Sequence, residues 1–211
     1  MTPERTPELF DSWAENYDDF VDTVSDRFPF AGYHQVLDRM VELSDPKEGM
    51  RVLDMGIGTG GLAKRFVDFN CEIWGLDYSS KMLEKAAQKV PSAHLVKADI
   101  RSEWPSELRI GFDLIVSAYS IHHLDLNAKL DTIKRMHDEL LNKEGRIVIG
   151  DVSFRSFAER AAARRELAHE WDDYEYYWAA DETKTMLWGE GLYVVYEQIS
   201  FCGGVYLIVS V

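Results

Sequence analysis

The feature that most constrains this chain is a short apolar strand that ends in a carboxylate and leads directly into a glycine-rich turn. The residues are Val52-Leu53-Asp54-Met55-Gly56-Ile57-Gly58-Thr59-Gly60. Glycines at every second position carry no Cβ atom, so the backbone can adopt positive φ and lie close to a ligand. The helical pattern that follows points its free N–H groups at the same place. The segment therefore predicts a strand that turns sharply beneath a bound ligand.

Strand and helix patterns alternate between residues 51 and 150. Short apolar runs predict the strands, and the segments between them carry apolar residues at helical spacing. The predicted strands cover residues 51–55, 72–76, 93–96, 112–117 and 146–150. Asn127 is expected to cap the helix that precedes the last of them. This alternation is typical of βαβ units and predicts an α/β protein with one Rossmann-like, doubly wound domain.

The two ends of the chain depart from this alternation. Residues 1–48 carry aromatic and apolar residues at helical spacing and are expected to form a helical segment before the first strand. Residues 154–171 predict a further helix, and residues 192–200 and 205–211 predict two strands joined by a glycine-containing turn. That is a hairpin signal. We therefore expect a mostly parallel, seven-stranded sheet with a C-terminal antiparallel hairpin at its edge.

Charge and cysteine content narrow the classes of partner. The chain of 211 residues carries 37 acidic and 23 basic residues, a net charge of −14. This argues against nucleic acid or an anionic membrane as the main partner, because both need a basic face. Cys71 and Cys202 do not make a disulfide framework, and the start Met1-Thr2-Pro3-Glu4 carries no apolar signal run. We expect a soluble cytoplasmic protein, as a monomer or homodimer.

Three aspartates stand at the ends of successive predicted strands. They are Asp54, Asp77 and Asp99, separated by 23 and 22 residues, or about one strand and one helix each. Ligands of open α/β sheets bind outside the carboxyl ends of the strands. A single aspartate there can be only a helix cap, but three at matching positions favour a ligand with hydrogen-bond donors or positive charge.

With these residues the chain resembles the class I S-adenosylmethionine (SAM)-dependent methyltransferases over essentially its full length. Among them it is similar to small, uncharacterised bacterial enzymes that begin with Phe-Asp-x-Trp-Ala-x-x-Tyr-Asp, here residues 10–18. The other matching motifs are Asp54-Met55-Gly56-Ile57-Gly58-Thr59-Gly60, Gly75-Leu76-Asp77-Tyr78-Ser79, Val96-Lys97-Ala98-Asp99-Ile100 and Phe112-Asp113-Leu114-Ile115-Val116-Ser117. The resemblance implies a methyltransferase domain at residues 49–211, with residues 1–48 as a helical lid.

The resemblance also implies how the methionine end of SAM would be bound. The turn that contains Gly56, Gly58 and Gly60 would pass beneath the methionine and the ribose. Asp54 would face the ammonium group, and Ser117 would offer it a carbonyl oxygen. An acidic and aromatic pocket suits a sulfonium cation. Tyr17, on the lid, is expected to close over this end.

The adenosine end would be bound by residues at the second and third strands. Asp77 would accept both ribose hydroxyls, a task that suits a carboxylate with two acceptor oxygens. Tyr78 and Met82 would pack on the adenine or the ribose. Asp99 would accept the adenine amino group, and the backbone N–H of Ile100 would complete that edge.

The candidate catalytic residues follow the fourth and fifth strands. His122 and His123 can serve as general base if the acceptor must lose a proton, although one of an adjacent pair often points into the protein. Asp151 faces the same rim, or serves as a cap or turn residue. The histidines also suggest a metal site, but we expect none, because adjacent side chains rarely bind one ion and no nearby cluster of ligands supports them.

We therefore predict an enzyme that transfers a methyl group from SAM to a small molecule and leaves S-adenosylhomocysteine (SAH). A non-catalytic SAM- or SAH-binding module is an alternative. A nicotinamide-dependent oxidoreductase is another, since Gly56, Gly58 and Gly61 also match the dinucleotide fingerprint G-x-G-x-x-G. The position of Asp54, two residues before the first glycine, counts against it. The aromatic residues 171–178 are expected to shape the acceptor site or to pack the lid on the sheet.

Overall fold

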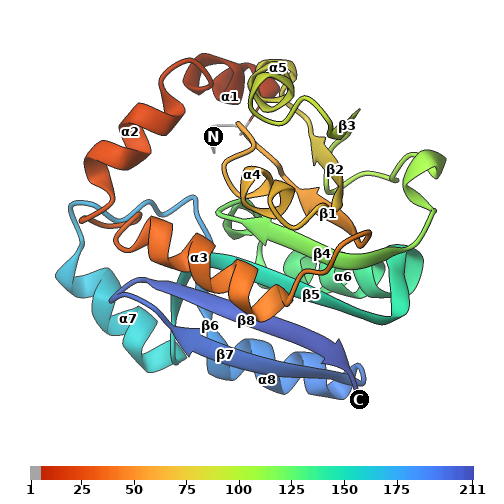
Figure 1. Cartoon of the computed structure of the whole chain (residues 1–211). Coiled ribbons are helices and arrows are strands. Elements are labelled where there is room, and N and C mark those ends of the chain that lie inside the picture. The colour runs from red at the N-terminus through yellow and green to blue at the C-terminus, as the bar shows by residue number, and fades with distance from the viewer. Residues whose placement is uncertain (1–5) are drawn as a thin grey trace.

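The computed structural model describes residues 6–211 and places one mixed sheet at the centre of the molecule (Figure 1). Met1 to Glu4 and the rest of residues 1–5 lie outside the described part. The strand order is β3-β2-β1-β4-β5-β8-β7, and a short β6 pairs separately with β5. The strands are β1 Arg51–Met55, β2 Glu72–Asp77, β3 His94–Lys97, β4 Phe112–Ala118, β5 Leu141–Phe154, β6 Trp178–Ala179, β7 Leu192–Gln198 and β8 Gly203–Ser210.

The predicted sheet topology is confirmed. Strands β1 to β5 pair in parallel, whereas β8 pairs antiparallel with both β5 and β7. The order reverses between β1 and β4, so the carboxyl ends of both strands border a crevice there, as in other open α/β sheets. This crevice is where the three aspartates were expected to meet.

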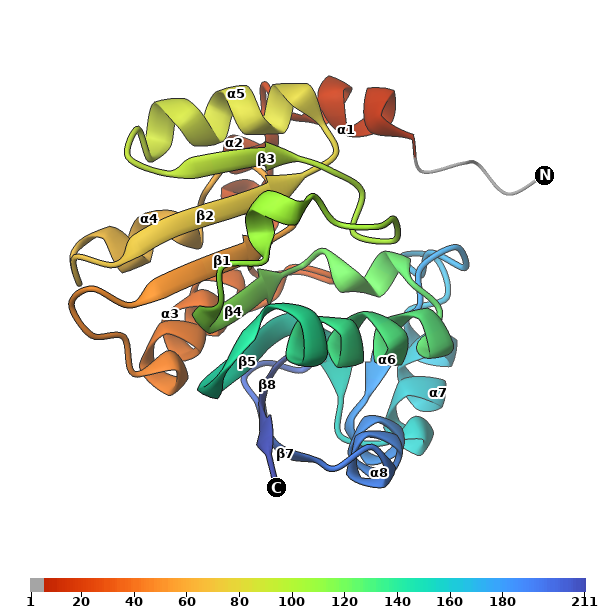
Figure 2. The same cartoon turned by 90° about the vertical axis from the view of Figure 1, so that its right-hand side faces the viewer.

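Helices cover both faces of the sheet (Figure 2). The helices are α1 Pro7–Trp13, α2 Tyr17–Val24, α3 Tyr33–Ser44, α4 Ala63–Val67, α5 Ser80–Lys89, α6 Leu126–Arg135, α7 Phe157–Glu166 and α8 Ala180–Gly189, with short helical turns η1 Ser106–Leu108, η2 Ile121–His123 and η3 Met136–Leu140. Successive strand residues face opposite sides. Val52 thus packs with α3 and α4, while Leu53 packs with α6 and α8. No helix within residues 6–211 has the length and apolar character that crossing a bilayer requires.

The N-terminal helices lie over the carboxyl ends of the strands, with α1 beside α5 (Figure 1). Asp11 accepts hydrogen bonds from the Ser79 hydroxyl, at 2.6 Å, and from the Lys81 backbone N–H, at 3.1 Å. A carboxylate at this position satisfies free N–H groups at the start of α5. The apolar stripe of the sequence is divided between α1 and α2, which join at residues 14–16.

Three local predictions differ from the structure. Asn127 does not cap α6; the cap is Asp125, which accepts a hydrogen bond from the Ala128 N–H at 2.9 Å. Asn127 lies inside the first turn, where its side chain cannot serve the N-terminal N–H groups. Strand β5 extends well beyond the predicted residues 146–150. Helix α8 was not anticipated, because its sequence shows only weak separation of apolar and polar faces.

Candidate functional site

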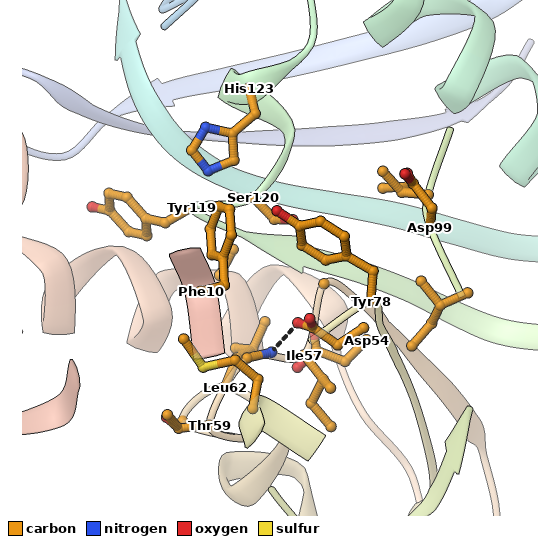
Figure 3. Close-up of a pocket in the computed structure, with 18 of the residues that line it drawn as sticks. Phe10, Asp54, Ile57, Thr59, Leu62, Tyr78, Asp99, Tyr119, Ser120 and His123 are labelled. Carbon is orange, nitrogen blue, oxygen red and sulfur yellow. Dashed lines mark hydrogen bonds between the residues drawn. The ribbon is translucent and has the colours of Figure 1, made fainter. Parts of the chain in front are cut away.

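A cavity of about 280 Å³ lies at the carboxyl ends of β1, β2 and β4 and extends beneath α1 and α2 (Figure 3). Ten of the predicted site residues line it: Tyr17, Asp54, Gly56, Gly58, Asp77, Tyr78, Met82, Asp99, Ile100 and His123. The other four, Gly60, Ser117, His122 and Asp151, do not contribute to its lining. The structure thus brings the motifs of four separate strand ends to one enclosed space.

The glycine turn is shaped by the backbone of β2 and by the loop after β4. The N–H groups of Gly56 and Ile57 both donate to the Leu76 carbonyl, at 2.8 and 3.0 Å. Gly56 has φ of +79°, and a Cβ atom there would lie 2.0 Å from the Ser120 Oγ. A side chain is therefore excluded at Gly56 by conformation and by space.

Two buried carboxylates lie beside this turn. Asp54 is 1% exposed, and its Oδ2 atom has no hydrogen-bond partner among residues 6–211. Burial, together with the negative charge of Asp77, raises the pKa of Asp54 to about 8. Buried polar atoms in folded proteins are normally paired, so an unpaired carboxylate oxygen in a residue that lines a cavity favours a ligand that donates hydrogen bonds or carries positive charge.

Asp77 is held by the backbone on both sides. Its Oδ2 accepts the N–H of Gly58 and its Oδ1 accepts the N–H of Ser79, each at 2.9 Å. Burial nevertheless raises the pKa of Asp77. The Tyr78 backbone N–H also acts on the carboxylate, and because a carboxylate offers about four acceptor sites, Asp77 keeps acceptor capacity for a ligand.

Asp99 lies at the far end of the cavity and is paired with a neighbour. The Arg101 guanidinium contacts both carboxylate oxygens, with Nη2 at 2.6 Å from Oδ2. Burial alone would raise the pKa of Asp99, but the hydrogen bonds from Arg101 lower it overall. Asp99 is therefore an ionised acceptor at the edge of the cavity.

Aromatic side chains form the wall opposite the carboxylates. Phe10, Tyr78 and His123 come from three different segments and face the same space (Figure 3). The Phe10 ring lies 5.2 Å from the Tyr78 ring and 5.4 Å from the His123 ring, measured between centroids. The hydroxyl of Tyr119 is buried there without a hydrogen-bond partner in the described chain. Aromatic faces beside carboxylates suit a cation.

Several lining residues were not predicted from the sequence. Phe10 belongs to the N-terminal motif and could have been found through it, whereas Tyr33 and Arg101 carry no local signal. The complete unpredicted set is Phe10, Tyr33, Ile57, Thr59, Gly61, Leu62, Leu76, Ala98, Arg101, Ala118, Tyr119, Ser120 and Leu124. Asp18 connects α2 to the rest of the site: it accepts a hydrogen bond from the Thr59 hydroxyl and contacts the Lys89 ammonium, both at 2.6 Å.

The predicted catalytic residues meet at one end of the cavity. His123 contributes to the wall, and the buried His122 packs against it with ring centroids 4.1 Å apart. The Nδ1 atom of His122 lies 2.6 Å from an Asp151 oxygen. Burial acts to lower the pKa of His122, but the Asp151 charge and hydrogen bond outweigh it and raise the pKa. Glu175, which the sequence did not point to, faces both histidines.

Comparison with known proteins assigns the chain to a family. Residues 52–145 match the model of a methyltransferase domain. An uncharacterised methyltransferase of Geobacillus thermodenitrificans is 30% identical over 201 residues, which cover 90% of each chain.

Solved structures show the same fold at low sequence identity. The complex of DhpI with SAH has a TM-score of 0.71 and 13% identity, covering 97% of this chain and 94% of that one. The magnesium protoporphyrin IX methyltransferase of Synechocystis PCC 6803, with bound SAH, has a TM-score of 0.72 and 14% identity, covering 96% and 98%. With the match to the methyltransferase domain and the relative that spans nearly the whole chain, we conclude that this protein belongs to the class I methyltransferase family.

Proposed function

We propose that the protein transfers a methyl group from SAM to a small-molecule acceptor. The observation that carries this proposal is the unpaired, buried Asp54 oxygen beside an aromatic wall in the cavity above the glycine turn. This carboxylate acceptor and aromatic wall fit a ligand with an ammonium group and a sulfonium cation, and two solved structures of the same fold contain bound SAH.

The residues divide the proposed cofactor site into two ends. Asp77 and Asp99 would accept hydrogen bonds from the ribose and the adenine, with Tyr78, Met82 and the Ile100 N–H packing or bonding beside them. Asp54, the turn residues Gly56 and Gly58, and Tyr17 would enclose the methionine end.

Two residues predicted to bind SAM do not line the cavity, and they would act indirectly, by supporting residues that do. Gly60 has φ of +83°, and a Cβ atom there would lie 3.3 Å from the Ala86 backbone of α5. The Ser117 hydroxyl donates to the Met55 carbonyl at 2.7 Å, which joins the end of β4 to the end of β1. Both residues would support the position of the glycine turn.

Bound SAM would supply an electrophilic methyl group on a positively charged sulfur. The pocket residues would hold the acceptor in line with it, and such positioning can lower a barrier by about 7–11 kcal/mol. The lid helices would exclude water, which strengthens the polar contacts inside. Loss of the methyl group converts the sulfonium to a neutral thioether, so no proton need be delivered to the leaving group.

The acceptor would approach from the His123 end of the cavity. His123 would contact it, while His122 and Asp151 would position His123 from behind. A cavity of about 280 Å³ beneath a helical lid favours a small molecule. The net charge of −14 weighs against a nucleic-acid acceptor.

Turnover with fractionated metabolites tests this function directly. Purified protein is incubated with methyl-labelled SAM and with cell extract separated by molecular size, and SAH and labelled product are measured. We expect SAH to form only with a low-molecular-weight fraction. Tight SAM binding without turnover in any fraction would instead support a non-catalytic binding module, and a fluorescence response to NADH without SAM binding would support an oxidoreductase.

The raised pKa of Asp54 predicts a pH dependence of SAM binding. The free carboxyl has a pKa of about 8, so it holds a proton below that pH, whereas a cationic ligand favours the ionised form. Binding should therefore release a proton, and affinity should rise by up to about tenfold per pH unit as the pH approaches 8. Calorimetry in buffers of different ionisation enthalpy measures the release. The Asp54→Asn variant serves as control for titration of SAM itself; equal release in both proteins would contradict the assignment.

A further inference from the structure

The side chains of His122, His123 and Glu175 converge at the acceptor end of the cavity. Their potential ligand atoms all lie within 4.8 Å of one another. The Oε1 atom of Glu175 is 3.8 Å from the Nε2 of His122 and 3.9 Å from the Nδ1 of His123. We propose that these three side chains bind one divalent transition-metal ion such as Zn²⁺. This inference rests on the proposed function only for the role of the ion, not for its binding.

The geometry is close to what such an ion requires. Tetrahedral coordination with bonds of about 2.0–2.1 Å places the ligand atoms about 3.3–3.4 Å apart. The separations from Glu175 are 3.8 and 3.9 Å, and all three ligand atoms lie within 4.8 Å of one another, so binding would require the side chains to move closer together. Two imidazoles and one carboxylate are also a ligand set that zinc enzymes use, leaving a further position for water or substrate.

Asp151 fixes the position of the His122 ring. It lies 2.6 Å from the Nδ1 of His122 and accepts hydrogen bonds from the His122 backbone N–H at 3.0 Å and from the Trp178 indole at 3.1 Å. If the Nδ1 N–H is donated to Asp151, Nε2 remains as the metal-binding atom, 3.8 Å from Glu175. Metal-ligating histidines commonly donate their other N–H to a carboxylate in this way.

Glu175 is supported independently of the histidines. Burial, and next the nearby charge of Glu175, raises the pKa of the Tyr177 hydroxyl, so Tyr177 lies beside the Glu175 carboxylate. The backbone N–H of Tyr176 donates to the His122 carbonyl at 2.8 Å, which fastens the segment of Glu175 to η2. The three side chains are only 8%, 19% and 12% exposed, in the order His122, His123 and Glu175. A metal ion would compensate the buried carboxylate charge.

The place of the site determines what the ion would do. His123 is part of the cavity wall, so the ion would lie beside the acceptor rather than beside the three aspartates. A divalent ion lowers the pKa of an oxygen or sulfur atom that it binds. The proposal therefore selects acceptors that carry a hydroxyl or thiol group, whose proton would go to solvent before methyl transfer.

Metal titration of the whole protein tests the site. After chelator treatment and dialysis, Zn²⁺ is titrated by calorimetry, and the absorption spectrum with Co²⁺ is recorded. We expect one ion per chain with tetrahedral Co²⁺ bands. Glu175→Gln should weaken Zn²⁺ binding at least tenfold, and Asp151→Asn should weaken it about 10- to 100-fold. His137→Gln, which changes a histidine outside the cavity, should leave it unchanged.

Two outcomes would overturn the site. One is that Zn²⁺ binds no more tightly to the wild-type protein than to Glu175→Gln, when thermal unfolding curves show that both proteins are folded. The other is that His137→Gln weakens binding as much as Glu175→Gln does, which would indicate adventitious surface binding. SAM binding, measured in the same samples, separates this result from the proposed function: its absence counts against the cofactor site, and its presence without Zn²⁺ binding counts against the metal site alone.

Discussion

Replacing Asp77 by alanine is expected to weaken SAM binding by more than tenfold. The carboxylate is buried at the end of β2, lines the cavity and is held by the Gly58 and Ser79 N–H groups. Hydrogen bonds to a charged group contribute about 1.5–3 kcal/mol each, and alanine removes the acceptor for both ribose hydroxyls. Calorimetry with SAM and with SAH measures the loss.

Two further variants separate this effect from damage to the turn. Asp77→Asn keeps the shape and one acceptor oxygen, so it should bind SAM more weakly than the wild type and more tightly than Asp77→Ala. Glu72→Ala, at the opposite, exposed end of the same strand, should bind normally. A folded Asp77→Ala protein with unchanged SAM affinity would refute the ribose assignment.

Replacing Gly56 by alanine should abolish measurable SAM binding and lower the melting temperature. The new Cβ atom would lie 2.0 Å from the Ser120 Oγ and 2.7 Å from its Cβ, at a residue with φ of +79°. The turn and the loop after β4 would have to separate, and both line the cavity. The conformational strain alone costs about 1–3 kcal/mol, and the steric conflict adds to it.

The chain offers a matched control for this variant. Gly58 also has positive φ, of +54°, but a Cβ atom there would meet no atom within 4 Å. Gly58→Ala should therefore show only the conformational cost, with a smaller loss of stability. Adding Ser120→Gly to Gly56→Ala removes the steric conflict and should recover part of the melting temperature. Equal destabilisation by the two single variants would mean that space at Ser120 does not matter.

The arrangement of charges distinguishes this cavity from one built for phosphate. The charge of Asp77 adds to the cost of ionising Asp54, and the glycine turn directs one of its N–H groups to Asp77 rather than into open space. A cationic ligand relieves that electrostatic cost, whereas a phosphate would increase it. The pH dependence of SAM binding and the loss at Asp77 therefore test one physical idea by two measurements.

The order of strands and helices could be predicted because it follows from local periodicity. Parallel βαβ units place the carboxyl ends of their strands on one edge of the sheet. Asp54, Asp77 and Asp99 could therefore be assigned to one cavity from their spacing alone. The predicted cap of α6 was wrong by two residues: both Asp125 and Asn127 are residue types that can cap a helix, and in the structure Asp125 accepts the hydrogen bond from the Ala128 N–H.

What only the tertiary structure decided are the contacts between segments far apart in the sequence. Phe10 and Tyr119 both line the cavity although they lie 109 residues apart in the chain, and Glu175 approaches the histidine pair from 52 residues beyond His123. The raised pKa of Asp54 likewise depends on burial by the whole fold. The periodicity of apolar residues indicates which face of a helix or strand is buried, but not which side chains of other elements pack against that face. The amino-acid sequence thus determined the sheet and its acidic rim, and only folding determined the cavity wall and the candidate metal site.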